Sequence, residues 1–195
     1  MINENMSCQE ILEHVARRKL KGVMAHADMA DIFNLMNLHG FKRKHEYQSL
    51  KENAELMSLK RYITERYKVI PDLKGASIDI NPMDVKKVGT RDNITRENKS
   101  KITYEIFKIL LDWEKETLDM LQKAYVLLLD REHIADSIKI SKLIKDTDKE
   151  LKYYRRDWIK LNDINWDLTL ITLSQHDLHE EYREKTEQIY KLEFN

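Results

Sequence analysis

The sequence has 195 residues, and its 34 lysine and arginine residues are balanced by 34 aspartate and glutamate residues, so the net charge is zero with histidine neutral. The balanced charge argues against strong binding to nucleic acid or anionic lipid. The single cysteine, Cys8, excludes an internal disulfide. No apolar run approaches the ~18–20 residues that span a bilayer. We therefore expect no membrane partner, no nucleic-acid partner and a cytoplasmic location.

The placement of glycine and proline divides the chain into two helical parts. Four of the six glycine and proline residues lie between positions 71 and 89, and neither type occurs from position 90 to the end. Because glycine and proline are the strongest helix breakers, helix is the natural interpretation of the second half. We predict one domain, 1–195, with a long connection at about 69–97.

Two helices are predicted before this connection. Ser7-Cys8-Gln9-Glu10 has the form of a capping box and precedes an apolar pattern with helical spacing. The first helix is expected at about 7–39, with Gly40 just beyond its C-terminus. The second is expected at about 42–68, because Pro71 cannot continue it.

The second predicted helix has two apolar faces. One face contains His45, Ser49, Glu52, Leu56, Leu59, Ile63 and Tyr67, and the opposite face contains Tyr47, Leu50, Ala54 and Met57. A helix with two apolar faces must be covered on both sides, either inside the protein or in an oligomer. We therefore expect a homo-oligomer.

Three helices are predicted after the connection, at about 97–129, 131–161 and 164–191. Asp130 is the expected N-cap of the middle one. A helix of ~28 residues is ~42 Å long. Two hairpins of such helices joined by a long crossover predict an all-α, antiparallel four-helix bundle with an additional C-terminal helix.

This order of helices resembles the ferritin-like superfamily. The segment SLKENAEL, with Glu52 and Glu55, resembles the ligand-bearing stretch of the second ferritin helix, and LDWEK resembles the third at Glu114. IKDTDKE offers Asp146 and Asp148 on the fourth helix. The resemblance implies a di-metal carboxylate site for iron, with Glu52, Glu55, Glu114 and Asp148 as ligands, in a storage or oxidation protein.

The sequence also departs from the ferritin-like pattern. It has no Glu-x-x-His pair on the second or fourth helix, and such pairs mark di-iron carboxylate bundles. Thr117 and Thr147 fall at core positions that would face a metal. Glu150 replaces Asp148 as the candidate if the fourth helix is rotated. Glu52 also has a structural interpretation, because a buried glutamate is usually part of an ion pair or a hydrogen-bond network.

Other clusters suggest chemistry less specifically. The basic segment Phe41-Lys42-Arg43-Lys44-His45 could contact nucleic acid, but such clusters are usually solvated helix faces. His176, His179 and Glu180 have helical metal-ligand spacing, without an identifiable further ligand. Two hypotheses remain open: a ferritin-like, metal-binding homo-oligomer, and a non-enzymatic helical scaffold or interaction module that has lost the metal.

Overall fold

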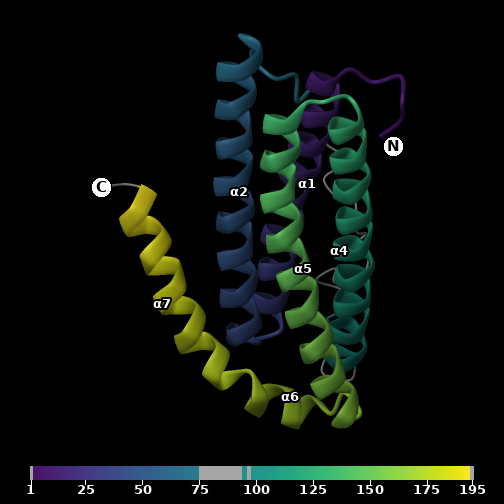
Figure 1. The fold of residues 1–195 in the computed structure, drawn as a ribbon. Helices are drawn as coiled ribbons and strands as arrows, with labels where there is room; N and C mark the ends of the chain where they lie inside the picture. Colours follow the sequence, from purple (N-terminus) through teal and green to yellow (C-terminus); the bar gives the residue numbers. More distant parts are fainter. Residues whose placement is uncertain (1, 75–93, 96–97, 194–195) are drawn as a thin grey trace.

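The computed structural model describes residues 2–74, 94–95 and 98–193, and in these residues the chain forms an all-α bundle (Figure 1). The helices are α1 (Cys8–Leu35), α2 (His39–Tyr67), α4 (Lys99–Asp130), α5 (Ile134–Asp163), α6 (Leu168–Ser174) and α7 (His176–Glu193). The predicted fold class, a helical bundle with a C-terminal addition, is confirmed. Among the described residues, none of the helices combines the length and the apolar character needed to cross a membrane.

The four long helices form two antiparallel hairpins, α1 with α2 and α4 with α5. Lys99, at the start of α4, donates a hydrogen bond to the carbonyl of Met36, which follows the end of α1. At the other end of α4, the Arg131 side chain donates to the carbonyl of Met6, just before α1. Helix α4 is therefore antiparallel to α1 and parallel to α2, so the chain between α2 and α4 must connect opposite ends of the bundle. Most of that predicted crossover, 75–93 and 96–97, lies outside the described residues.

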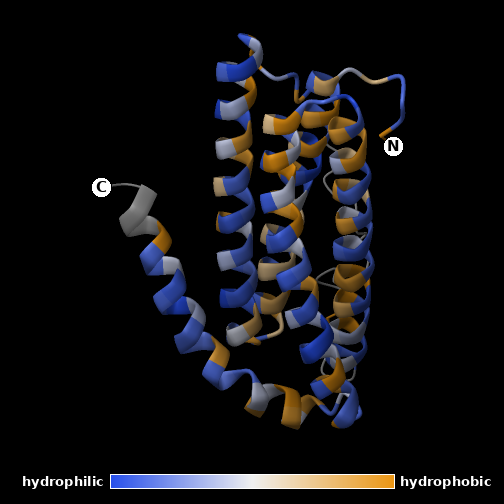
Figure 2. Ribbon diagram, viewed as in Figure 1, coloured by the Kyte–Doolittle hydropathy of each residue, from blue (hydrophilic) through white to orange (hydrophobic). Residues whose placement is uncertain are grey.

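The core consists of two apolar regions with a polar layer between them. One region lies where α1 begins and includes Ile11, Leu59 and Leu128. The other lies where α1 ends and includes Phe33 and Phe107. In Figure 2, hydrophobic residues are concentrated on the inner sides of α4 and α5, whereas the outer side of α2 and most of α7 are hydrophilic. This is the arrangement expected when amphipathic helices bury one face each.

The start of α1 and the end of α2 agree with the sequence signals. The Ser7 hydroxyl accepts a hydrogen bond from the Glu10 N–H at 3.2 Å, and the Glu10 carboxylate accepts one from the Ser7 N–H at 2.6 Å. This is the predicted capping box. Helix α2 ends at Tyr67, and the following residue, Lys68, has a left-handed backbone (φ 57°) that terminates the helix three residues before Pro71.

Two predicted helix boundaries are wrong. Gly40 is not the residue that closes α1: α1 ends at Leu35, Asn37 adopts the left-handed conformation (φ 59°), and Gly40 lies inside α2. Asp130 is not the N-cap of α5 but the last residue of α4, and His133 precedes α5 without a side-chain cap. In both cases a non-glycine residue with positive φ makes the turn, which residue type alone does not predict.

The C-terminal part contains two helices instead of one. The Asp167 carboxylate caps α6 by accepting from the Leu170 N–H at 2.9 Å, and the chain breaks again at Gln175 before α7. Helix α7 packs against α2, with the rings of Tyr47 and Tyr182 5.5 Å apart. At Tyr47, the second apolar face of α2 is therefore covered by the same chain, whereas Met57 on that face remains 52% exposed.

Candidate functional site: a buried charge cluster

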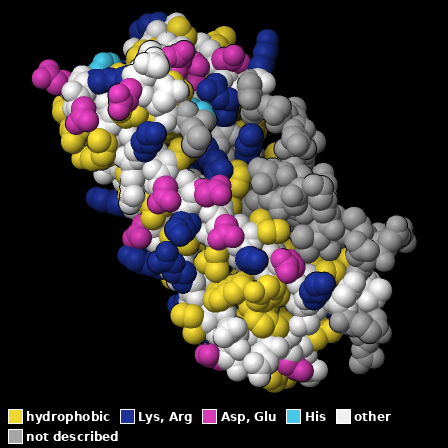
Figure 3. Space-filling model, turned by 90° about the vertical axis from the view of Figure 1, so that its right-hand side faces the viewer, with side chains coloured by type: hydrophobic (Ala, Val, Ile, Leu, Met, Phe, Trp, Pro, Cys, Tyr) yellow, Lys and Arg dark blue, Asp and Glu magenta, His cyan; other side chains and the backbone are white. Residues whose placement is uncertain are grey.

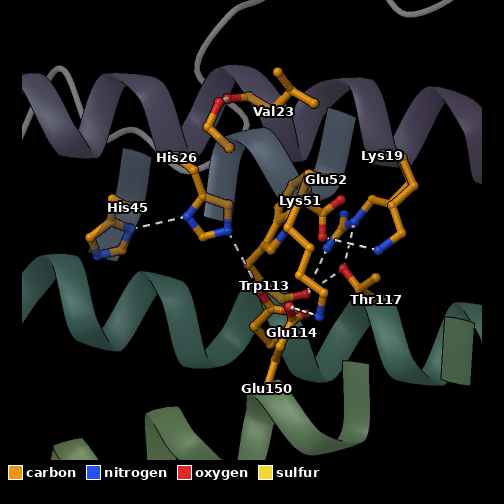
Figure 4. Close-up of polar contacts among 12 residues, drawn as sticks. Lys19, Val23, His26, His45, Lys51, Glu52, Trp113, Glu114, Thr117 and Glu150 are labelled. Carbon is orange, nitrogen blue, oxygen red and sulfur yellow. Dashed lines mark hydrogen bonds and ion pairs between the residues drawn. The ribbon is translucent and has the colours of Figure 1, made fainter. Parts of the chain in front are cut away.

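The polar layer of the bundle contains six charged side chains, which we call the core charge cluster. They come from four helices and are Lys19 of α1, Lys51, Glu52 and Glu55 of α2, Glu114 of α4 and Glu150 of α5. Figure 4 shows Lys19, Lys51, Glu52, Glu114 and Glu150 together in the bundle interior. The members belong to different helices, so the cluster exists only when the hairpins are assembled.

Lys19 joins α1 to α2 through two ion pairs. Its Nζ lies 3.0 Å from Glu52 Oε1 and 2.6 Å from Glu55 Oε2, and its side chain is only 2% exposed. Gly22, one turn further along α1, makes room for the same carboxylate, because a Cβ at this position would lie 3.0 Å from Glu52 Oε2. The carboxylate of Glu52 therefore lies directly against the backbone of α1.

Lys51 continues the cluster towards α5. Its Nζ lies 2.6 Å from Glu150 Oε1 and 3.8 Å from Glu55 Oε1. The two lysines therefore link Glu52, Glu55 and Glu150 in alternating charge order. Such alternation reduces the cost of burying each charge, since a buried ion needs an oppositely charged partner.

Glu114 differs from the other carboxylates because its neighbour is a histidine. His26 Nε2 lies 3.8 Å from Glu114 Oε1, and His26 Nδ1 lies 3.0 Å from His45 Nδ1 (Figure 4). The His45 ring stacks on Phe33 with ring centroids 5.2 Å apart. Burial lowers the pKa of His26 and, more strongly, that of His45. Both rings are consequently neutral near pH 7, and the Nδ1–H of one ring donates the hydrogen bond to the unprotonated Nδ1 of the other.

Burial and mutual repulsion raise the pKa of three carboxyl groups, those of Glu52, Glu114 and Glu150, and so favour their protonated form. Burial raises the pKa of Glu52 to about 7, although Lys19 lowers it, and Glu55 adds to the rise. Burial likewise raises the pKa of Glu114 to about 7 and that of Glu150 to about 6. For Lys19, burial lowers the pKa, but the neighbouring carboxylates outweigh this effect and hold the pKa well above its usual range. The cluster thus contains positively charged lysines beside three glutamates, Glu52, Glu114 and Glu150, that titrate near neutral pH.

Arg18 closes one side of the cluster. Its guanidinium lies 3.2 Å from the centroid of the Trp113 ring, and its Nε donates to the Thr117 hydroxyl at 2.9 Å. It also forms a 3.5 Å ion pair with Glu116. Thr117 was expected at the core and is buried there. Its hydroxyl accepts a hydrogen bond from Arg18 and donates one to the Trp113 carbonyl of the same helix, so Thr117 is bonded within the protein.

Three of the four predicted metal ligands lie together, and the fourth does not. Glu52, Glu55 and Glu114 are members of the core charge cluster, whereas the side chain of Asp148 is 45% exposed and pairs with Lys152 at 2.6 Å. Glu150, the alternative on the fourth helix, is buried in the cluster. Positions 148 and 150 are ~200° apart around a helix, so they lie on nearly opposite faces and only one of them can point into the bundle.

The most important residue that the sequence analysis missed is Lys19. Val15, Lys19, Gly22 and His26 follow one another at spacings of four, three and four residues. This spacing marks one helix face, and all four residues are buried. A lysine within such a buried stripe is a signal for an ion pair in the core.

In this arrangement the core charge cluster does not fit a metal ion. In the parts of the chain that the structure describes, no group of three or more histidine, cysteine, aspartate or glutamate side chains is placed to hold one. The oxygens of Glu52 and Glu55 that point inward face the Lys19 ammonium group instead. Each Asp, Glu or His ligand would first have to lose its present partner or move.

Of the other charged segments singled out in the sequence, the basic segment reaches the core charge cluster through His45, which contacts His26 beside Glu114. In the basic segment at the start of α2, Lys44 and His45 are buried, and Lys42 and Arg43 pair with Glu46. The surface in Figure 3 intermixes Lys and Arg side chains with Asp and Glu, as a balanced charge predicts. On α7, His179 contacts Glu180 at 3.2 Å on an exposed helix face.

Comparison with known proteins does not place the chain in a family. No model of a known protein family matches the sequence, and none of the curated proteins matches it.

Proposed function

We propose that this protein is a non-enzymatic helical scaffold or protein-interaction module with a ferritin-like bundle, in which lysine ammonium groups neutralise the buried carboxylates. The observation that carries this proposal is the position of Lys19 Nζ, 3.0 Å from Glu52 and 2.6 Å from Glu55. In a ferritin-like bundle such carboxylates bind metal. Here an ammonium group, fixed to the fold through α1, has the corresponding electrostatic role.

Energetics support the metal-free interpretation. A metal ion bound by Glu52 and Glu55 would displace the Lys19 ammonium group, whose side chain is 2% exposed. A buried charge without a partner costs several kcal/mol, so the bound metal would have to offset this cost before it gained affinity. The buried ion pairs instead link α1 to α2 and α2 to α5, which is a structural role.

A second candidate function is metal binding, with iron storage or oxidation by a homo-oligomer. The observation that favours it is an excess of negative charge: the cluster has four carboxylates and two lysines. The Glu114 carboxylate lies 3.8 Å from His26, which is neutral near pH 7 and therefore does not balance a negative charge on Glu114. Excess buried carboxylates can be neutralised by protons or by a divalent cation, and the raised pKa of Glu114 reflects the proton alternative.

Metal analysis separates the two functions. The protein is purified without chelator, its metal content is measured, and the measurement is repeated after addition of ferrous iron in air. The scaffold proposal predicts substoichiometric metal that is the same in the wild type, Glu52→Gln and Glu114→Gln. About one or two metal ions per chain, lost in both variants, would overturn it and establish the second function.

A matched control excludes adventitious binding at surface carboxylates. Asp148→Asn removes an exposed carboxylate that pairs with Lys152, so it should not change the metal content under either proposal. Glutamine replaces glutamate in the core variants because it preserves the volume while removing the charge. Far-ultraviolet circular dichroism confirms that each variant remains helical before its metal content is interpreted.

A further inference from the structure

A cavity of about 580 Å³ lies at the end of the bundle where α5 leads into α6 and α7. Its wall includes six apolar side chains, namely Phe41, Leu161, Ile164, Leu170, Leu173 and Leu178. These belong to the start of α2, the end of α5, and the two C-terminal helices. The cavity is therefore formed when α6 and α7 fold back across the base of the bundle.

Two of the wall residues are unusually exposed for their size. Leu170 is 44% exposed and Leu173 is 67% exposed, and both belong to the seven-residue helix α6. Phe41, another wall residue, is buried. Apolar surface that stays in contact with water at the rim of a concave site is favourable to cover, roughly 25 cal/mol per Å². The cavity is thus apolar, and the apolar side chains at its rim are solvent-exposed.

The charged groups at the cavity provide no net charge for a ligand. The ionisable side chains in its wall are Asp157, Lys160 and Asp163. Asp157 forms an ion pair with the fully buried Lys44 of α2, so its charge is already neutralised within the protein. Lys160 and Asp163 have opposite signs. A charged ligand would therefore find no unbalanced countercharge in this wall.

We propose that this cavity is a binding site for a small, uncharged, mainly apolar molecule. The volume lies within the 300–1,000 Å³ typical of small-molecule sites, which are also mostly apolar with few polar groups. The site is distinct from the core charge cluster, because its wall contains none of the six cluster residues. The inference therefore does not depend on whether the cluster binds a metal.

The test uses the full chain and two matched fluorescent probes. N-phenyl-1-naphthylamine is neutral and apolar, and 8-anilino-1-naphthalenesulfonate has a similar ring system with a negative charge. We expect the neutral probe to bind saturably, with one site per chain and at least tenfold tighter than the sulfonate. Energy transfer from tryptophan reports the location, because Trp158 and Trp166 are close in sequence to the wall residues Asp157 and Ile164.

The variant Leu173→Glu places a charge at the rim, at a position exposed enough for the fold to be retained. It should weaken binding of the neutral probe at least tenfold. Ile138→Glu is the matched control, since Ile138 is 55% exposed on α5 and lies about 28 Å from Asp157 along that helix. Its affinity should remain within twofold of the wild type.

Three results of the binding measurements would each overturn the proposal: no saturable binding of the neutral probe, equal loss of binding in both variants, or tighter binding of the sulfonate. Sedimentation velocity tests one further alternative, that a second copy of the chain covers this surface. If Leu173→Glu converts a dimer into a monomer, a second copy of the chain covers this surface and the small-molecule site is rejected. A single species of unchanged mass, with binding lost only in Leu173→Glu, supports it.

Discussion

The Lys19 ammonium group lies 3.0 Å from the Glu52 carboxylate in an interior where both side chains are at most 9% exposed. A salt bridge at this depth is costly to form and more costly to break, because the group that remains has no solvent to replace its partner. The pair therefore determines how the middle of the bundle tolerates changes of charge, pH and volume.

Replacement of Lys19 by methionine should strongly destabilise the protein. The variant leaves Glu52 and Glu55 buried without their ammonium partner, and breaking a buried pair in this way costs about 3–5 kcal/mol. Urea denaturation followed by circular dichroism measures the loss. Lys152→Met is the control, because the exposed pair of Lys152 with Asp148 should contribute less than about 1 kcal/mol.

The same pair predicts a rescue. Addition of Glu52→Gln and Glu55→Gln to the Lys19→Met variant removes the unpaired charges, and should recover most of the lost free energy of unfolding. If the triple variant is as unstable as Lys19→Met alone, the damage comes from lost packing of the lysine chain and the electrostatic explanation is wrong.

The stability of the protein should depend on the protonation of Glu114. Its pKa in the folded state is raised to about 7 from the ordinary value of 4.5, so the folded protein binds this proton more tightly than the unfolded chain. The stabilising contribution is complete below pH 4.5 and is lost as the pH rises to about 7. Glu114→Gln, which cannot ionise, should therefore gain stability relative to the wild type as the pH rises from 5 to 8.

Chemical denaturation at several pH values measures this difference. The histidines have the opposite sign: the lowered pKa values of His26 and His45 mean that stability is lost as the pH falls below about 6.5. Comparison of Glu114→Gln with the wild type subtracts the part of that contribution that does not depend on the contact of His26 with Glu114. A stability difference that is constant with pH would contradict the raised pKa.

Gly40→Ala should detach the C-terminal helices. A Cβ at Gly40 would lie 1.9 Å from the backbone oxygen of Gln175, at the junction between α6 and α7, and backbone cannot move aside cheaply. We expect faster amide exchange across 168–189, measured by mass spectrometry, with the other helices protected. The net cost should be about 1–3 kcal/mol from the steric overlap, reduced by the better helix propensity of alanine.

Gln175→Ala is the matched control for this region. The Gln175 side chain accepts a hydrogen bond from the Gly40 N–H, so its removal loses one polar contact without introducing a clash. Its effect on exchange should be smaller than that of Gly40→Ala. Equal effects would show that the hydrogen bond, not the close approach of the backbones, holds α7 to α2.

The effect of Gly22→Ala on the free energy of unfolding should change sign when Glu52 is replaced. In the wild type the new Cβ would lie 3.0 Å from Glu52 Oε2, so the carboxylate must move within its pairing with Lys19, and we expect net destabilisation. With Glu52→Ala in place, the space is open and alanine should stabilise α1 by about 1 kcal/mol. Urea denaturation of the four proteins in this double-mutant cycle measures the coupling. A coupling near zero would mean that the two residues do not meet.

The sequence determined the helices and their order because local signals are sufficient for them. Glycine and proline placement, the Ser7–Glu10 capping box and the apolar periodicity predicted the long helices and the crossover, with ends accurate to a few residues. The periodicity also placed Glu52 on the inward face of α2, where it is buried. The break at Gln175 was missed, because neither glycine nor proline marks it.

The tertiary structure alone decided how the buried charges are paired. Lys19 and Glu52 are 33 residues apart, and no local pattern indicates that their side chains meet. The phase of α5, which places Glu150 inside and Asp148 outside, follows from packing against the other helices. The need for glycine at positions 22 and 40 likewise comes from groups distant in sequence, because the Glu52 carboxylate lies close to Gly22 and the Gln175 backbone lies close to Gly40. Helix formation is a property of neighbouring residues, whereas charge compensation and close packing depend on groups that only the assembled bundle brings together.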